Sequence, residues 1–276
     1  MLERILLRSC KTLAVILMLV WSLFPIVFIM TSSFKPGREI FAAPPQWLFQ
    51  PTFEHYAKLW DRWGAFFVGL LNSTIITIGA AALAVIASTC AGYIYSRYSN
   101  RFLDASLAGL IAVRLIPPIV VTLPLFPIIN NLGLADTHFV LSVLYATFFV
   151  SLGTVLMRTF IDQIPRELDE AAAIDGGTTL IILKRVIVPL AAPGIIAVAV
   201  FVVVFAWNEF LFAFIFTSTK AKTAPLVISE MIGSIEGVGW GVLFAASTIQ
   251  LLPVLLFVMV MNRYLVAGLT AGATKG

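Results

Sequence analysis

The sequence from Trp63 to Ser96 reads WGAFFVGLLNSTIITIGAAALAVIASTCAGYIYS and contains no Asp, Glu, Lys or Arg. A helix needs about 20 predominantly apolar residues to cross the hydrocarbon core of a bilayer, and this stretch is long enough. Five further stretches are comparably apolar, with Arg114 and Glu209 inside two of them and Asp104 close to the start of one. Together they predict six spanning helices, at about residues 12–33, 68–95, 103–127, 138–158, 190–217 and 241–263.

The overall composition indicates the same class of protein. Of the 276 residues, 60% are hydrophobic and only 12% are charged, whereas a soluble domain carries about 25% charged residues. This excludes a cytosolic enzyme, a secreted binding module and a disordered chain. We therefore expect an all-α, polytopic membrane protein. Because no internal repeat is visible, the simplest organisation is a single transmembrane domain over residues 1–276.

The first apolar stretch, Thr12–Phe34, follows basic residues and resembles a signal peptide in that respect. Its apolar run exceeds the 7–15 residues of a signal-peptide core, and no clear cleavage site follows it. We interpret it as a retained spanning helix, with a cleaved signal peptide as the alternative.

The basic residues between the spans predict the orientation. With both termini inside, eleven Lys and Arg residues lie on the cytoplasmic side and six lie outside, which the positive-inside rule favours. The inside set is Arg4, Arg8, Lys11, Arg97, Arg101, Arg158, Arg166, Lys184, Arg185, Arg263 and Lys275, and the outside set is Lys35, Arg38, Lys58, Arg62, Lys220 and Lys222.

Motifs of catalysis and of nucleotide or metal binding are missing from the sequence. There is no Gly-Lys dipeptide and hence no P-loop, and two separated histidines, His55 and His138, exclude a zinc-protease motif. A nucleophile elbow is absent as well, and Cys10 and Cys90 are too few for a cysteine-based metal site or a disulfide framework. We expect no catalytic site, no metal and no cofactor in this chain, so ATP would have to bind to another subunit.

The segment Pro165–Pro189 is the most informative part between spans. Its first half, PRELDEAAAIDG, predicts a short helix, with Pro165 at the first helical position and acidic residues in the first turn. Gly176 and Gly177 predict a left-handed stop. Thr178 or Thr179 can cap a second short helix that ends in basic residues. Two helices joined by a glycine bend would make a compact projection at the cytoplasmic face.

This segment resembles the EAA loop of permease subunits in binding-protein-dependent ABC importers. Glu170-Ala171-Ala172, Gly176 and Val186-Ile187-Val188-Pro189 match that motif in spacing, with valines in place of its isoleucine and leucine. The alternative is an amphipathic interfacial hairpin without a partner.

The resemblance implies an importer type I permease fold with the coupling loop at residues 161–189. It also implies a heterodimer with a second permease, two ATPase subunits that bind ATP and Mg, and an extracytoplasmic solute-binding protein, in the cell inner membrane and without nucleic acid. The residues expected to contact the ATPase are Glu170, Ala171, Ala172, Asp175, Gly176 and Pro189. Those expected to contact the binding protein, in the loop between the last two spans, are Gly233, Gly237 and Gly239.

Three further stretches resemble the carbohydrate-uptake branch of this family, in particular the six-span second permease of maltose- and trehalose-type systems. They are Trp207-Asn208-Glu209-Phe210, Arg114–Pro118 and the C-terminal Gly268–Gly276. The resemblance implies import of a carbohydrate or sugar derivative. Alternatives are a glycerol-phosphate derivative, for which Arg114 would be an anion partner, and an ion-coupled carrier without an ATPase.

Polar and proline residues inside the predicted spans indicate where solute would pass. Charged groups in a membrane face a cavity or a partner, so Arg114 and Glu209 form either a structural ion pair or part of the pathway. Prolines leave backbone carbonyls that lipid cannot satisfy, which favours a cavity-lining position over a packing kink. Gly92 suits close helix packing. The expected pathway residues are Arg114, Pro117, Pro118, Trp207, Asn208 and Glu209.

Overall fold

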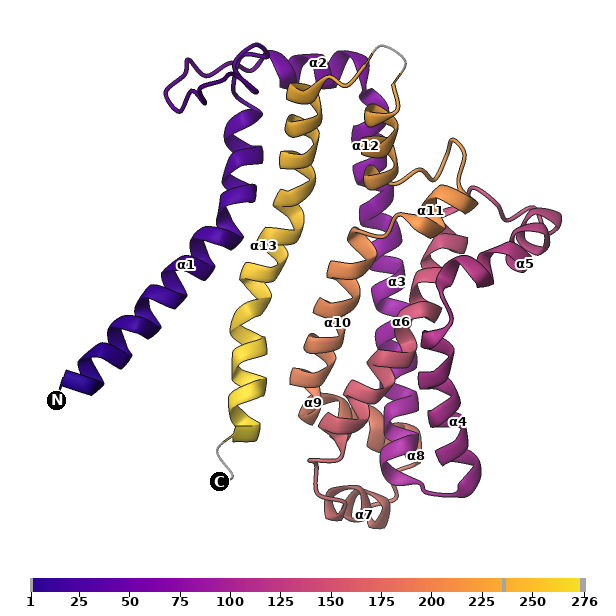
Figure 1. Ribbon diagram of the computed structural model, residues 1–276. Helices are drawn as coiled ribbons and strands as arrows, with labels where there is room; N and C mark the ends of the chain where they lie inside the picture. The colour runs from indigo at the N-terminus through magenta and orange to yellow at the C-terminus, as the bar shows by residue number, and fades with distance from the viewer. Residues whose placement is uncertain (1, 235–236, 274–276) are drawn as a thin grey trace. The chain divides into compact units, whose positions relative to one another are not determined.

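The computed structural model describes residues 2–234 and 237–273, with side chains from Cys10 to Met261 outside that gap. The described residues form helices and no strand, which confirms the all-α fold (Figure 1). The end of the expected C-terminal motif, residues 274–276, lies outside them. The helices are α1 (Leu2–Ser32), α2 (Glu54–Arg62), α3 (Gly64–Arg97), α4 (Arg101–Ala112), η1 (Val113–Leu115), α5 (Pro118–Asn131), α6 (His138–Ile161), α7 (Glu167–Ile174), α8 (Thr179–Ile182), η2 (Leu183–Ile187), α9 (Val188–Leu190), α10 (Ala192–Trp207), α11 (Leu211–Phe216), α12 (Ala224–Ile232) and α13 (Trp240–Ala273).

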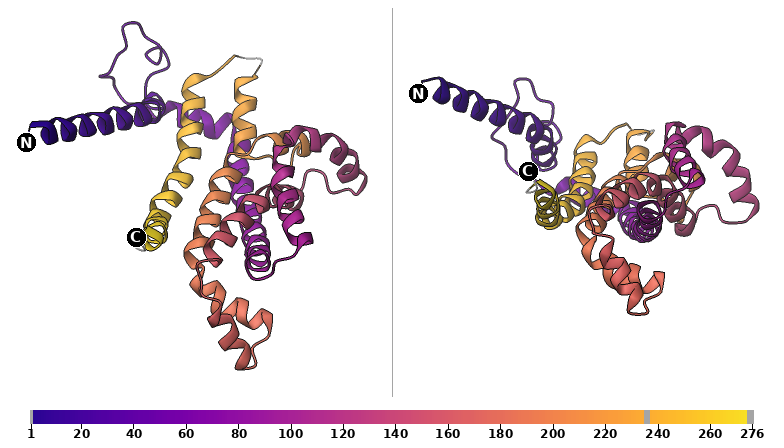
Figure 2. Two further views of the ribbon diagram at one scale, coloured as in Figure 1. Left: turned by 60° about the horizontal axis from the view of Figure 1, so that its bottom comes forward. Right: turned by 90° about the horizontal axis from the view of Figure 1, so that it is seen from below.

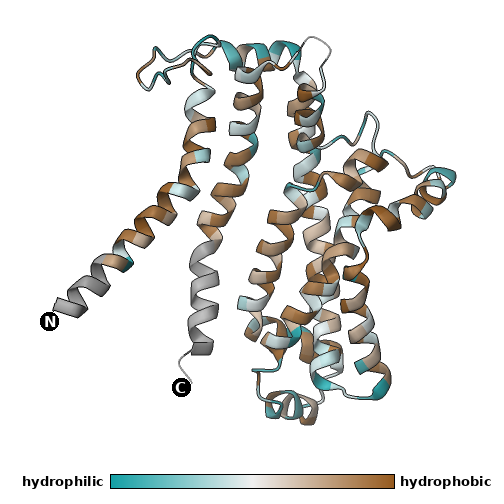
Figure 3. Cartoon of the chain, viewed as in Figure 1, coloured by the Kyte–Doolittle hydropathy of each residue, from teal (hydrophilic) through white to brown (hydrophobic). Residues whose placement is uncertain are grey.

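Four helical stretches of the described chain are long and apolar enough to cross a membrane, and the number rises to six if each of two bent pairs is one span. Figure 3 shows hydrophobic residues along much of these helices, with hydrophilic residues concentrated towards their ends. With both bent pairs counted as spans, the number equals the six predicted from the sequence. The four unbroken ones are Cys10–Ser32, Gly64–Arg97, His138–Ile161 and Trp240–Met261.

The third span is not the continuous helix predicted over residues 103–127. It breaks after Leu115, and α5 starts at Pro118 with its axis turned by 94°. Ile116 and Pro117 are extended at the break, with ψ angles of 122° and 133°. Proline disfavours a helical conformation in the residue before it, and two consecutive prolines therefore end the first helix here.

The fifth span also departs from the single helix predicted over residues 190–217. The 79° bend between Thr179–Leu190 and Ala192–Trp207 lies at the predicted start of the span, where Pro193 in the first turn of α10 prevents the earlier helix from continuing. A second interruption at residues 208–210 separates α10 from α11.

The contacts divide the chain into two compact units. Unit 1 runs to Phe67 and resumes at Val227–Leu252, and unit 2 comprises Val68–Leu226 and the chain from Pro253. The core of unit 2 is built mainly from α3, α6, α10 and α11, which we call the bundle (Figures 1 and 2). Its largest fully buried side chains include those of Tyr145 and Met157.

Small residues let the helices of the bundle approach closely, as the sequence predicted for Gly92. A Cβ atom built on Gly92 would lie 2.9 Å from the backbone nitrogen of Arg158 on α6. A Cβ on Gly194 would lie 2.5 Å from the ring of Phe160. These distances are too short for a side chain, so both glycines are required by packing.

Candidate functional site

The segment predicted as two short helices projects from one end of unit 2 (Figures 1 and 2). Its first helix, α7, begins at Glu167 with Arg166 as the N-cap residue. Pro165 therefore lies just outside the helix rather than at its first position, which corrects the prediction by two residues. The first turn of α7 holds three acidic residues, as the positive end of a helix dipole favours.

The glycine bend after α7 has the predicted left-handed conformation. Gly176 has φ +84°, and its N–H donates to the carbonyl of Ala173 at 3.0 Å. The N–H of Gly177 donates to the carbonyl of Ala172 at 2.9 Å. These two bonds form a Schellman motif, which satisfies carbonyls at the helix end. A Cβ on Gly177 would lie 2.6 Å from the Ala172 carbonyl oxygen, so the second glycine is required by space.

The outer surface of the projection is accessible and partly apolar. Two aliphatic side chains stand out, because Ile174 is 86% exposed and Leu180 is 72% exposed. Apolar side chains beside carboxylates on a protruding helix suit docking into a partner. The expected ATPase-contact residues Glu170, Ala171, Asp175, Gly176 and Pro189 are exposed, and Ala172 is half-buried.

The second half of the projection differs from the single capped helix that was predicted. Thr178 is the N-cap residue of α8, but its side chain makes no capping hydrogen bond. The helix does not end at Lys184 and Arg185. It continues through the π-helical turn η2 and the short α9 to Leu190. A π-turn widens the helix by one residue and shifts the side chains that follow it.

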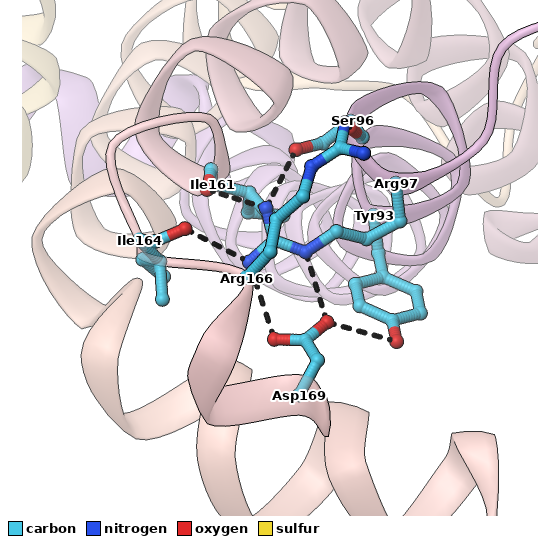
Figure 4. Close-up of polar contacts among 7 residues, drawn as sticks. All are labelled: Tyr93, Ser96, Arg97, Ile161, Ile164, Arg166 and Asp169. Carbon is cyan, nitrogen blue, oxygen red and sulfur yellow. Dashed lines mark hydrogen bonds and ion pairs between the residues drawn. The ribbon is translucent and has the colours of Figure 1, made fainter. Parts of the chain in front are cut away.

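A cluster of charged side chains attaches the projection to the bundle, and the sequence analysis missed it (Figure 4). The Nε and Nη2 groups of Arg97, at the end of α3, donate to the two carboxylate oxygens of Asp169 on α7, at 2.9 and 3.2 Å. The Tyr93 hydroxyl donates to the same carboxylate at 3.3 Å. The positive-inside count uses Arg97 only as a marker of orientation. A basic residue at the C-terminal end of a long apolar helix was the signal available.

The expected pathway residues of the third span lie at its break. Pro117 lies in the turn between η1 and α5, Pro118 is the first residue of α5, and Arg114 is in η1 just before them. The guanidinium carbon of Arg114 lies 5.0 Å from the ring centroid of Phe148 on α6, within the range of a cation–π contact. Arg114 is half-buried.

The expected pathway residues of the fifth span lie at its second interruption. Trp207 is buried at the end of α10, and the exposed Asn208 donates through its amide to the carbonyl of Val204 at 2.8 Å. Glu209 accepts hydrogen bonds from the N–H groups of Phe212 and Ala213 at 2.9 and 3.4 Å. Its carboxylate therefore caps α11. In the described part of the chain, no ion pair joins Glu209 to Arg114.

Asp136, between α5 and α6, holds a distant segment of unit 2. Its carboxylate accepts four backbone N–H groups and two hydroxyls from residues 218–221, at 2.9–3.1 Å. Asp136 itself has φ +59°. Burial raises its pKa, but the four backbone N–H groups more than offset this and hold the pKa well below its usual range.

A second set of contacts holds the next part of the same segment. The Asn72 side chain on α3 donates to the carbonyls of Lys220 and Lys222, each at 2.9 Å. The Asn72 carbonyl oxygen faces Nε2 of His138 at 2.7 Å. The Ser73 hydroxyl accepts from the N–H of Ala224 at 3.0 Å. Pairs this far apart in sequence leave no local pattern, and the sequence analysis therefore did not find them.

The three glycines expected to meet a binding protein lie in unit 1 and are exposed. Gly237 has φ +89°, a conformation that favours glycine. Gly237 and Gly239 line an open hollow of about 800 Å³ with His55, Trp63 and Trp240. Among the described residues, no group of three His, Cys, Asp or Glu side chains is placed to hold a metal ion.

Comparison with known proteins identifies the family. Residues 83–271 match the family described as "binding-protein-dependent transport system inner membrane component". The chain is 31% identical to the trehalose/maltose transport system permease protein MalG of Thermococcus litoralis, over 99% of both chains. It is 34% identical to the trehalose transport system permease protein SugB of Mycobacterium tuberculosis, over 93% of both.

The fold is also similar to a solved structure. A chain of a bacterial ABC transporter involved in the import of the acidic polysaccharide alginate has 20% identity and a TM-score of 0.79, covering 94% of this chain and 96% of that one. The matched family covers the projection, the α3–α7 cluster and both broken spans. The chain therefore belongs to the multi-pass inner-membrane components of binding-protein-dependent ABC transport systems.

Proposed function

We propose that this chain is one permease subunit of an ATP-driven importer that moves a carbohydrate delivered by a solute-binding protein. The observation that carries the proposal is the projection formed by α7 and α8. It exposes the Glu170–Gly176 motif at the end of a broken-helix bundle, where an ATPase subunit can reach it. The names of the relatives from Thermococcus litoralis and Mycobacterium tuberculosis support a sugar as the solute.

The projection is suited to transmit a movement from an ATPase. Glu170 offers an exposed carboxylate for a charge-assisted hydrogen bond, and Ile174 offers an apolar side chain for a pocket. ATP and Mg belong to two partner ATPase subunits, since this chain has no P-loop. We assign the coupling loop to residues 161–189 of a single permease domain that comprises residues 1–276.

The positive-inside count supports an orientation with both termini and the projection in the cytoplasm. The loop with Gly233, Gly237 and Gly239 would then face the binding protein. A second permease would complete a heterodimer around the two broken spans. Breaks in spanning helices often flank transport sites, which supports Arg114, Pro117, Pro118, Trp207, Asn208 and Glu209 as pathway residues.

Reconstitution of the complex into lipid vesicles tests this proposal. We expect a binding protein loaded with maltose or trehalose to stimulate ATP hydrolysis and ATP-dependent uptake of the labelled sugar. The chain alone should do neither. Uptake by the chain alone at an undiminished rate, or uptake driven by an ion gradient without ATP, would overturn the importer assignment.

A further inference from the structure

Three helix ends meet where the projection joins the bundle: the last turn of α3, the last turn of α6 and the first turn of α7. Besides its two bonds to Asp169, Arg97 donates to the carbonyl of Ile161 at 3.3 Å and to that of Ile164 at 3.1 Å (Figure 4). Arg166 donates in the opposite direction, to the carbonyl of Ser96 at 3.0 Å. An arginine from another segment therefore donates to carbonyls at the C-terminal end of α3 and at the C-terminal end of α6.

The chemistry of these contacts favours a rigid connection. The last carbonyls of a helix have no partner within it and carry the negative end of its dipole, and a cation satisfies both. The side chains of Arg97 and Asp169 are only 7% and 13% exposed, so water and salt screen this ion pair weakly. A planar guanidinium can bind a carboxylate with two N–H groups and still donate to carbonyls.

We propose that Arg97 is a positioning residue that transmits the displacement of α7 to α3 and α6 together. This inference rests on the proposed coupling function of the projection and names the residue that connects it to the bundle. Asp169 completes the connection from the α7 side, and the Tyr93 hydroxyl holds its carboxylate in place. When an ATPase moves α7, the ends of α3 and α6 follow as one body.

The chain offers a matched control for the same chemical change. Arg158, about one turn before the end of α6, forms an ion pair with Asp162 at 3.6 Å. These side chains are 39% and 48% exposed, so the pair is more open to solvent than Arg97–Asp169. Arg97→Gln removes the buried connection, whereas Arg158→Gln removes a more exposed pair at the same end of the bundle.

The test uses the reconstituted complex and two readouts. The first is the amount of sugar transported per ATP hydrolysed. The second is the distance between spin labels at Thr159→Cys on α6 and Ala173→Cys on α7, both exposed positions, in a chain whose Cys10 and Cys90 are replaced by serine. We compare the nucleotide-free complex with the vanadate-trapped complex, so that a movement of α7 relative to α6 is measured directly.

We expect the label distance to be the same in both states of the unsubstituted chain. In Arg97→Gln it should differ between states or broaden, and the transport-to-hydrolysis ratio should fall at least tenfold while the ATPase still co-purifies. Asp169→Asn should have a similar effect with the carbonyl contacts intact, and Arg97→Lys should restore the ratio only in part. Arg158→Gln should behave like the unsubstituted chain.

An Arg97→Gln complex with an unchanged ratio and an unchanged distance would overturn the proposal. If that variant does not assemble, Asp169→Asn decides by the same criteria. Gly176→Val separates this failure from that of the proposed function. If Gly176→Val loses the ATPase while Arg97→Gln keeps a normal ratio and label distance, only the Arg97 connection is rejected. If both variants couple normally, the projection is rejected as the coupling element.

Discussion

Asp136→Asn should release the segment that follows α11. One oxygen of the Asp136 carboxylate accepts from the N–H groups of Ser218 and Ala221, and an amide oxygen can replace it. The other accepts from the N–H groups of Thr219 and Lys220, which would instead meet an amide donor. The substitution therefore removes two charge-assisted hydrogen bonds from backbone donors.

The magnitude follows from these two bonds. Hydrogen bonds to a charged group contribute about 1.5–3 kcal/mol each, and the lower value applies because Asp136 is only partly buried. The expected loss is about 3 kcal/mol of local stability, which corresponds to an opening equilibrium raised about 100-fold. Asparagine tolerates the left-handed conformation of residue 136, so the change isolates the charge from backbone strain.

Amide hydrogen exchange measured by mass spectrometry in lipid nanodiscs would check this value. Amides of residues 218–221 should exchange about 100-fold faster in Asp136→Asn, with the amides of α6 as an internal reference. Unchanged protection of residues 218–221 would refute the reasoning.

The pH dependence of the same protection has a defined sign. Because folding lowers the pKa of Asp136, its carboxylate stabilises the fold above the ordinary value of 3.8, and this stabilisation is lost as the pH falls through the folded-state pKa. After correction for intrinsic exchange, protection of residues 218–221 should be constant between about pH 5 and 8. A loss of protection within that range would contradict the assignment.

Three further substitutions have expected outcomes. Gly176→Val should cost about 1–2 kcal/mol at φ +84° and reduce co-purification of the ATPase, whereas Gly176→Asn should retain it; equal binding by both would argue against the bend. Glu209→Ala should remove about 0.5–2 kcal/mol of stability through the lost α11 cap and so lower the melting temperature; an unchanged melting temperature would contradict that role. Gly92→Ala should destabilise by about 1–3 kcal/mol through contact with the α6 backbone; normal thermal stability would show that the helices can separate freely.

The number of spans, the glycine bend and the close approach at Gly92 could be predicted because each depends on local sequence. Apolar length indicates a span, and a glycine after a short helix indicates a left-handed end. The sequence favours cavity-lining positions for Pro117 and Pro118, but the direction of the break there depends on packing against other helices. A continuous fifth span was predicted since nothing local shows that the Glu209 carboxylate caps the helix after it.

The two polar connections of unit 2 could not be predicted, because their partners are far apart in the chain. Arg97 and Asp169 are separated by 72 residues, and Asp136 and Ser218 by 82 residues. Each of these residues alone has an ordinary interpretation as a loop or interface charge. Only the three-dimensional arrangement shows that they are held in place by several hydrogen bonds each.

Successive residues of α7 face different surroundings, because side chains one position apart on a helix point about 100° away from each other. Asp169 is directed at Arg97, while its neighbour Glu170 is exposed. Under the proposed coupling role, variation on the outward side would adapt the subunit to a different ATPase without altering the attachment of α7 to the membrane helices. Hybrid transporters should be obtainable by exchanging the exposed residues of α7 while Asp169 is retained, whereas transplanting the whole helix would also require a matching arginine on α3.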